Sequence, residues 1–260
     1  MTIKRYQVDA FTNRIFAGNP AVVCPLTQWL PDTVMQNIAM ENNLSETAFY
    51  VKENTGYRIR WFTPALEVDL CGHATLATAY VMFHHEGYPE NEIQFQSRSG
   101  LLGVKKEGDW LTLDFPVHPV KPENDLVKFR NCFAHQPVQA FRGKEDYLLV
   151  FASEDQIADA RADISAILRL DARAVIITAP GNTVDFVSRF FIPKAGINED
   201  PVTGYAHTVL VPYWAGVLGK NSFEARQLSA RGGELRCQLR GNRVAISGQA
   251  RLFSVGEIFL

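Results

Sequence analysis

The sequence lacks several features that mark specialised classes of protein. Its four cysteines, Cys24, Cys71, Cys132 and Cys237, include no CxxC pair, which speaks against a zinc ribbon or a thioredoxin-like motif. No stretch approaches the roughly 20 apolar residues needed to span a bilayer. The N-terminal segment MTIKRYQVDAFTNRIF also lacks the apolar run of a signal peptide. We therefore expect a cytoplasmic protein with reduced thiols and no membrane partner.

The sequence also has no excess of charge of either sign. Its 26 basic and 28 acidic residues give a formal net charge of −2, which provides no electrostatic footprint for nucleic acid. Apolar residues make up 47% of the chain, enough for a full core. A length of 260 residues suits one large domain or two modest ones.

Hydrophobic periodicity predicts a mixed α+β fold. Helical patterns cover 31–41, 72–83, 155–169 and 204–218. Strand patterns cover 3–9, 20–24, 47–52, 57–62, 92–97, 101–106, 110–115, 147–152, 174–178 and 183–189. The proline-rich stretch FPVHPVKPEND is the best candidate for a linker, because proline is excluded from central strands.

The chain contains an internal repeat. The segment RWFTP at 60–64 resembles RFFIP at 189–193, and the same shift of 129 positions carries Cys71 onto Asp200. With a small insertion, the hairpin GDWLTL falls on GNRVAI. The repeat predicts two similar domains, 1–117 and 118–260, with a strand from 250–260 crossing back to complete the first.

The repeated unit has a chemical consequence. In each copy a loop leads into an apolar helix, and the unpaired N–H groups at a helix N-terminus favour anions. If the two domains pack about a pseudo-twofold axis, equivalent loops face each other across a cleft. A small carboxylate held from both sides is the ligand that this arrangement favours.

Four motifs in order resemble those of the PhzF family, the phenazine-biosynthesis-type isomerases with the diaminopimelate epimerase fold. The motifs are FAGNPAVV, NLSETAFYV, RWFTPALEVDLCGHATLA and EDPVTGYAH. The resemblance runs from about residue 3 to the C-terminus. It implies two pseudo-symmetric domains, each with antiparallel strands wrapped around a central helix, and an active site between them. It also implies proton-shift chemistry without cofactor or metal, and a homodimer.

The resemblance also assigns site residues. The family's catalytic glutamate matches Glu46, and its active-site histidine and aspartate match His73 and Asp200. The substrate carboxylate would be bound by backbone amides of Gly72 and His73, and by those of Gly204 and Tyr205. Asn19 would line the pocket. The family commonly has serine where this chain has Tyr205, and the bulkier phenol weighs against the characteristic phenazine precursor as the substrate.

The residues favour one mechanism and leave two alternatives open. A lone cysteine cannot run the two-thiol epimerase mechanism, whereas one carboxylate, Glu46, can take a proton from one carbon and return it to another. The first alternative is an epimerase or racemase that uses Cys71 and Asp200. The second is a carboxylate-binding protein without catalytic activity. Read without the family, Cys71 is a small buried hydrophobe and Asp200 a turn or helix-capping residue.

Overall fold

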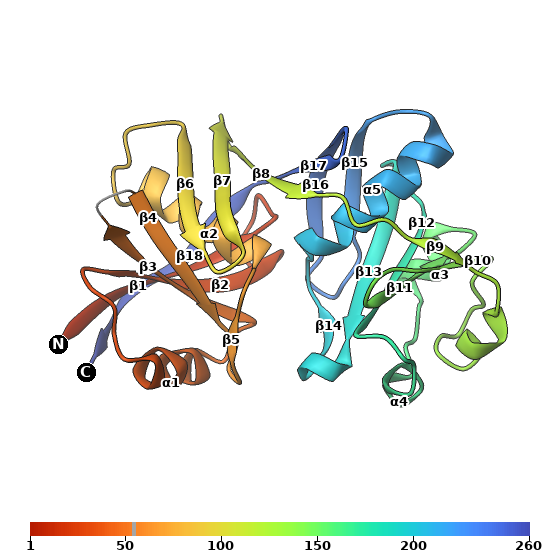
Figure 1. The fold of residues 1–260 in the computed structure, drawn as a ribbon, viewed down its shortest axis with the longest axis horizontal. Helices are drawn as coiled ribbons and strands as arrows, with labels where there is room; N and C mark the ends of the chain where they lie inside the picture. Colours follow the sequence, from red (N-terminus) through yellow and green to blue (C-terminus); the bar gives the residue numbers. More distant parts are fainter. Residues whose placement is uncertain (54–55) are drawn as a thin grey trace. The chain divides into compact units, whose positions relative to one another are not determined.

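The computed structural model describes residues 1–53 and 56–260, which form two units. Unit 1 comprises Met1–Asp114 together with Ser247–Leu260, and unit 2 comprises Phe115–Ile246. The chain thus leaves unit 1 once and returns to it for its last strand (Figure 1).

Unit 1 is a curled sheet around one helix. Its strands are β1 (Thr2–Ala10), β2 (Asn19–Leu26), β3 (Glu46–Glu53), β4 (Gly56–Phe62), β5 (Glu67–Val68), β6 (Glu92–Ser97), β7 (Gly100–Glu107), β8 (Trp110–Pro116) and β18 (Ala250–Phe259). β1 pairs antiparallel with both β18 and β2, and β2 pairs parallel with β3. β4 lies antiparallel to β3 and β5 and parallel to β6, while β7 joins β6 and β8 in antiparallel pairs.

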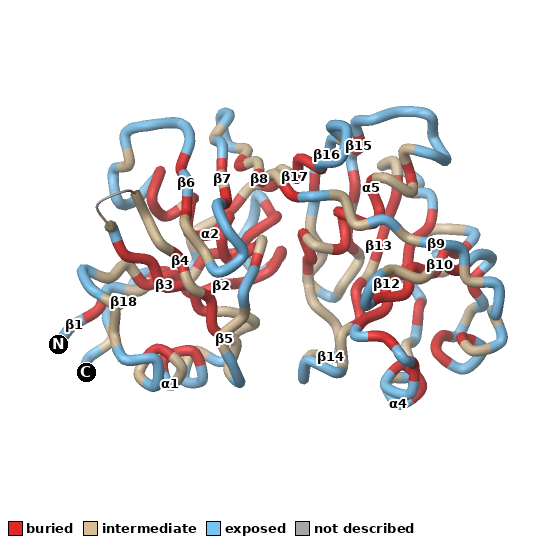
Figure 2. The backbone as a smooth tube through the Cα atoms, in the orientation of Figure 1, coloured by how far each residue is buried: buried red, intermediate tan, exposed pale blue. Residues whose placement is uncertain are grey.

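The enclosed helix of unit 1 is α2 (Gly72–His84). Ten of its 13 residues are buried, so it has no solvated face in its first turns, in agreement with its Ala-rich sequence (Figure 2). It packs on β1, β2, β3, β7 and β18. The other helix, α1 (Asp32–Asn42), buries only Met35, Ile38 and Ala39 against an outer cluster that includes Phe49. α1 forms the crossover between the parallel strands β2 and β3.

Unit 2 repeats this plan. Its strands are β9 (Lys121–Glu123), β10 (Gln139–Arg142), β11 (Asp146–Val150), β12 (Ala174–Pro180), β13 (Phe186–Ile192), β14 (Ile197–Asp200), β15 (Ser222–Gln227), β16 (Gly233–Arg240) and β17 (Arg243–Gly248). β10 pairs antiparallel with β9 and β11, and β11 pairs parallel with β12. β13 lies antiparallel to β12 and β14 and parallel to β15, and β15 pairs antiparallel with β16. This is the order found from β18 to β7 in unit 1. The central helix is α5 (Gly204–Leu218).

The predicted α+β fold of two similar units is confirmed, and most predicted elements are present. One prediction was wrong: instead of a single helix over 155–169, there are two short ones, α3 (Glu154–Ala158) and α4 (Ile164–Leu168). The cause lies in Asp163, whose side chain accepts a hydrogen bond from the Ala166 N–H and starts a new helix. The strand expected at 183–189 begins only at Phe186, and Pro122 lies in the short strand β9.

A repeated ion pair shows how the two copies align. Arg60 makes a bidentate pair with Glu67, both contacts at 2.7 Å, seven positions along the chain. Arg189 makes the same pair with Glu199, at 2.7 and 2.9 Å, but ten positions along. Each pair ties together the two strands that precede the central helix, β4 and β5 or β13 and β14. Three residues are therefore inserted in the second copy between the arginine and the glutamate.

The insertion corrects the predicted match of Cys71 with Asp200. Cys71 is the N-cap residue of α2, whereas the N-cap of α5 is Thr203. Asp200 ends β14, as Val68 ends β5. The helix-start position that holds a thiol in unit 1 thus holds a hydroxyl in unit 2.

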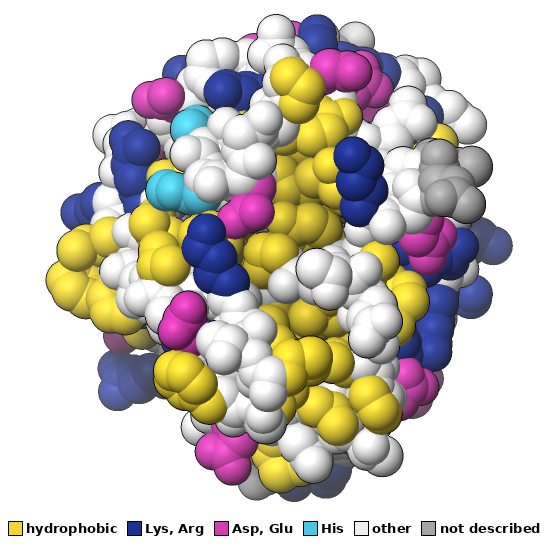
Figure 3. All heavy atoms as spheres, turned by 90° about the vertical axis from the view of Figure 1, so that its left-hand side faces the viewer, with side chains coloured by type: hydrophobic (Ala, Val, Ile, Leu, Met, Phe, Trp, Pro, Cys, Tyr) yellow, Lys and Arg dark blue, Asp and Glu magenta, His cyan; other side chains and the backbone are white. Residues whose placement is uncertain are grey.

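The face of the molecule drawn in Figure 3 shows no concentration of one charge. In Figure 3, basic and acidic side chains are interspersed around a region where hydrophobic side chains gather. Among the described residues, no helix is both long and apolar enough to cross a membrane.

Candidate functional site

Three of the predicted site residues meet in unit 1. Asn19 begins β2 and Glu46 begins β3, two strands paired in parallel, with Ala21 opposite Glu46. His73 is the second residue of α2. Its Nε2 lies 3.1 Å from Glu46 Oε2, and its Nδ1 lies 3.2 Å from Asn19 Nδ2. The imidazole thus lies between the carboxylate and the amide.

This cluster is buried and incompletely satisfied. The side chains of His73 and Glu46 are 6% and 16% exposed. Neither His73 Nε2 nor Glu46 Oε2 has a hydrogen bond to any described residue, since their close contact lacks the geometry of one. Buried polar atoms are nearly always hydrogen-bonded in native proteins, and exceptions concentrate at functional sites. A buried carboxylate oxygen without a hydrogen bond can accept one from a bound molecule.

The electrostatics favour a protonated histidine beside the carboxylate. Burial lowers the pKa of His73, but the neighbouring Cys71 and Glu46 outweigh this and raise the pKa well above its usual value. Burial raises the pKa of the Cys71 thiol to about 11, so the thiol is neutral near pH 7. An imidazolium donates from both nitrogens, so Asn19 would present its Oδ1 to Nδ1 at the same distance.

Cys71, Glu46 and His73 are also the group of side chains best placed to hold a metal ion among the described residues, with candidate ligand atoms within 4.8 Å of one another. Their contacts do not converge, however. Cys71 Sγ lies 3.5 Å from His73 Nδ1, whereas Glu46 faces Nε2 on the other side of the ring. One imidazole donates one nitrogen to a metal, so the ring separates the other two ligands. We assign no metal to this cluster.

In unit 2, Asp200 belongs to a loop held by one buried glutamine. Gln227 is 0% exposed, and its Nε2 donates to the Asp200 carbonyl at 2.7 Å. Its Oε1 accepts the Thr203 N–H at 2.9 Å. The Thr203 hydroxyl donates to Asp200 Oδ2. The loop that leads into α5 is therefore fixed from both ends by the Gln227 amide.

Replacing Gln227 with leucine should destabilise unit 2 strongly. The substitution leaves a buried N–H and a buried carbonyl without partners, so we expect a loss of about 3 kcal/mol in the free energy of unfolding. Urea unfolding of the variant measures this loss. The matched control is Gln238→Leu on the neighbouring strand, where the side chain is exposed; a similar loss there would contradict the assignment.

The two central helices begin alike. Gly72 and Gly204 are their first residues, and neither N-cap residue, Cys71 or Thr203, caps its helix through a side-chain hydrogen bond. The predicted carboxylate-binding amides of Gly72, His73, Gly204 and Tyr205 thus all lie in first helical turns. Helix N-termini of this kind bind anions.

Tyr205 is held by side chains that the sequence did not single out for function. Its ring lies 5.1 Å from the His118 ring and 4.9 Å from the Arg173 guanidinium. Arg173 Nη2 in turn contacts Asp146 Oδ2 at 3.1 Å. Burial, together with the Asp146 charge, raises the pKa of Tyr205, so the phenol stays neutral. Neither Asp146 nor Arg173 stands in a recognisable motif, and only the pairing of β11 with β12 brings their segments together.

His207, one helical turn into α5, has a structural role. It is fully buried, and its Nδ1 lies 2.9 Å from the Thr203 carbonyl oxygen, to which it donates. Burial lowers its pKa from 6.5 to about 4. It is therefore a neutral donor that supports the loop at the start of the helix.

This pKa predicts an acid-sensitive fold. Unfolded His207 binds a proton below about pH 6.5, whereas the folded state resists protonation down to about pH 4. Acidification across this window therefore favours unfolding, by about 2–3 kcal/mol between pH 7 and pH 4.5. Chemical unfolding at the two pH values measures the loss. His207→Gln should be less stable at pH 7 but lose less on acidification; an unchanged loss would contradict the assignment to His207.

Comparison with known proteins decides the family. The family model described as phenazine biosynthesis-like protein, PhzC-PhzF, matches residues 8–256. The chain belongs to this family. A protein of Pseudomonas aeruginosa named an uncharacterized isomerase is 50% identical over 260 residues, which is all of both chains. As a member of the family, the chain is an isomerase.

Solved structures agree on the fold. The crystal structure of a PhzF-family phenazine biosynthesis protein from Enterococcus faecalis is 48% identical, covers all of both chains and has a TM-score of 0.98. A hydroxyproline epimerase from Agrobacterium vitis is 8% identical and has a TM-score of 0.62 over 99% of this chain and 92% of its own. At this identity the likeness shows the fold alone. The expected epimerase-like fold is confirmed.

Proposed function

We propose that this PhzF-family isomerase moves a proton, and with it a double bond, within a small carboxylate metabolite. Glu46 is the proposed acid–base group. The observation that carries the proposal is the buried contact of Glu46 Oε2 with His73 Nε2, in which neither atom has a hydrogen bond to a described residue. A buried carboxylate beside an imidazole can serve as a general acid–base group.

The proposed reaction needs no redox step. The Glu46 carboxylate takes a proton from a substrate carbon next to a double bond. The electron pair of the broken C–H bond forms a new double bond to the neighbouring carbon and displaces the original π electron pair to the far carbon. The double bond shifts by one position, and the Glu46 carboxylic acid returns the proton to the far end of the displaced system. Atoms and electrons balance within the substrate and the one carboxyl group.

The other site residues would bind and orient the substrate. His73, which contacts both Glu46 and Asn19, would position the Glu46 carboxylate, and Asp200 would accept a hydrogen bond from the substrate. The amides of the first turns of α2 and α5 would bind the substrate carboxylate. Correct orientation of the reacting carbon contributes several kcal/mol to such a step.

The alternative of an epimerase or racemase that uses Cys71 and Asp200 is weaker. Two-base epimerisation needs a competent acid–base group at each position. Thr203 occupies the position in unit 2 that corresponds to Cys71, and its hydroxyl donates a hydrogen bond to Asp200. Burial also keeps the Cys71 thiol neutral.

A ligand screen followed by isotope exchange tests the proposal. Small carboxylate metabolites are screened by thermal shift, and those that bind are incubated with the protein in heavy water and followed by proton NMR. We expect at least one to isomerise or exchange a carbon-bound proton. Tight binding of carboxylates with neither reaction would favour a binding protein that has lost catalysis.

A further inference from the structure

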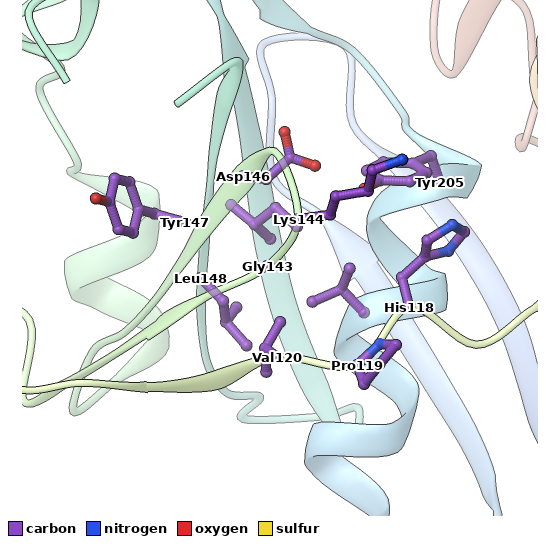
Figure 4. A pocket seen from close by; sticks show the side chains of 11 residues that line it. His118, Pro119, Val120, Gly143, Lys144, Asp146, Tyr147, Leu148 and Tyr205 are labelled. Carbon is purple, nitrogen blue, oxygen red and sulfur yellow. The ribbon is translucent and has the colours of Figure 1, made fainter. Parts of the chain in front are cut away.

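Unit 2 contains a cavity that is lined by none of the groups proposed to transfer a proton, although Tyr205, whose backbone amide is a proposed carboxylate donor, is part of its wall. Its volume is about 260 Å³, and it lies beside α5, between this helix, β11, β12 and the segment 118–120 (Figure 4). Apolar side chains form most of the wall: Pro119, Val120, Leu148, Ile176 and Val209. The polar lining residues His118, Lys144, Asp146 and Tyr205 all come from unit 2 as well.

A proline in α5 explains why the segment 118–120, which forms one wall of the cavity, binds to this helix. Pro212 lies inside α5 and has no N–H, so the Thr208 carbonyl four residues earlier lacks its usual helical partner. The His118 N–H donates to this carbonyl at 3.1 Å. His118 Nδ1 also lies 2.9 Å from the Thr208 hydroxyl. Two bonds to one helical residue thus hold 118–120 against α5.

One carboxylate at the cavity is buried with an incomplete set of hydrogen bonds, which is energetically costly. Asp146 is 3% exposed, and its Oδ2 is paired with Arg173. Its Oδ1 is buried and makes no hydrogen bond of full geometry to a described residue, and the Tyr205 hydroxyl is the neighbouring donor that interacts with this carboxylate. In Figure 4 the Asp146 carboxylate lies on the same side of the cavity as the Tyr205 ring. A buried carboxylate oxygen next to an apolar wall calls for a donor.

We propose that this cavity binds a small, mostly apolar, uncharged molecule with one N–H group, which donates to Asp146 Oδ1. The apolar walls would bury the body of the ligand, and the single acceptor would set its orientation. An uncharged ligand is favoured because Arg173 already balances the Asp146 charge and Lys144 at the cavity opposes a cation. The site uses none of the groups assigned to proton transfer and shares only Tyr205 with the proposed carboxylate site, through its side chain rather than its amide. Binding at the cavity is therefore measured separately from turnover.

Indole and 1-methylindole form a matched pair of probes, because they share their shape and differ in the N–H donor. Isothermal titration calorimetry on the full-length protein should show indole binding about tenfold more tightly. In Asp146→Asn the amide oxygen must turn to Arg173, which can only donate, so the NH₂ group takes the position of Oδ1. The preference for indole should then disappear. Equal affinity of the two probes for the wild type would overturn the proposal.

A second pair of variants tests the location. Val209 lines the cavity and is 3% exposed, whereas Val217 on the same helix is 55% exposed. Val209→Phe should fill the cavity and weaken both probes about tenfold. Val217→Phe should leave both affinities unchanged. Wild-type affinity in a folded Val209→Phe protein, or no binding of indole to the wild type at millimolar concentration, would place the ligand elsewhere or rule the site out.

Discussion

Replacing Glu46 with glutamine is expected to lower kcat/KM for the isomerised carboxylate by about 10³-fold, the scale of a lost general acid–base group. Glutamine keeps the size and polarity of the side chain but can neither take nor return a proton. The contact with His73 Nε2 at 3.1 Å can persist as a neutral one. The fold and substrate binding should therefore change little, which thermal unfolding and ligand titration would check.

Cys71→Ala is the control that separates the two enzyme mechanisms. The thiol is buried and neutral, 3.5 Å from His73 Nδ1, and the proposed reaction does not use it. The variant should retain much of the wild-type rate. If Cys71→Ala loses as much activity as Glu46→Gln, or if Glu46→Gln stays near the wild-type rate, the assignment of Glu46 as the proton carrier is wrong.

Gly18→Ala is expected to destabilise unit 1 by about 3 kcal/mol or more, the largest single-methyl effect that we predict. Gly18 has a positive φ of 65°, which an L side chain rarely adopts. A Cβ at this position would lie 2.1 Å from the Ala10 carbonyl oxygen and 2.7 Å from Thr12 Cγ2. The backbone must move to relieve the first clash, and Asn19 follows directly, so its contact with His73 should be lost too.

Gly87→Ala isolates the conformational part of this effect. Gly87 has a similar φ of 69°, but an added Cβ meets nothing within 4 Å. We expect a loss of about 1 kcal/mol there from the backbone alone. Denaturant unfolding of both variants measures the difference. Equal losses would show that the clash at Gly18 is relieved without strain and that FAGNP does not fix Asn19.

The sequence predicted best those elements whose signals are local. α2 and α5 were placed almost to the residue, because each is a long apolar run opened by a glycine. The helix expected over 155–169 failed because one capping side chain, Asp163, restarts the helix within a continuous pattern. Hydrophobic periodicity alone does not reveal that one helix ends and another begins within the pattern.

The candidate site was predictable only where a motif marks it. The family motifs named Glu46, His73 and Asn19, which the structure brings together in unit 1. The uniform shift of 129 residues misaligned Cys71 with Asp200 because residues are inserted between the arginine and the glutamate of the second copy. Hydrophobic periodicity does not reveal the length of a loop. The side chains around Tyr205 were not predicted from the sequence, because Asp146 and Arg173 meet only through the pairing of β11 with β12.

The most direct test of the central claim is the NMR spectrum of the product that the wild-type protein forms from its carboxylate substrate in heavy water. Proton return by Glu46 predicts a shifted double bond and unchanged configuration at every remaining stereocentre. Any deuterium incorporated from solvent should lie at a carbon that loses or gains the migrating proton. Accumulation of the substrate's epimer, with deuterium at the inverted centre and the double bond in place, would contradict the account.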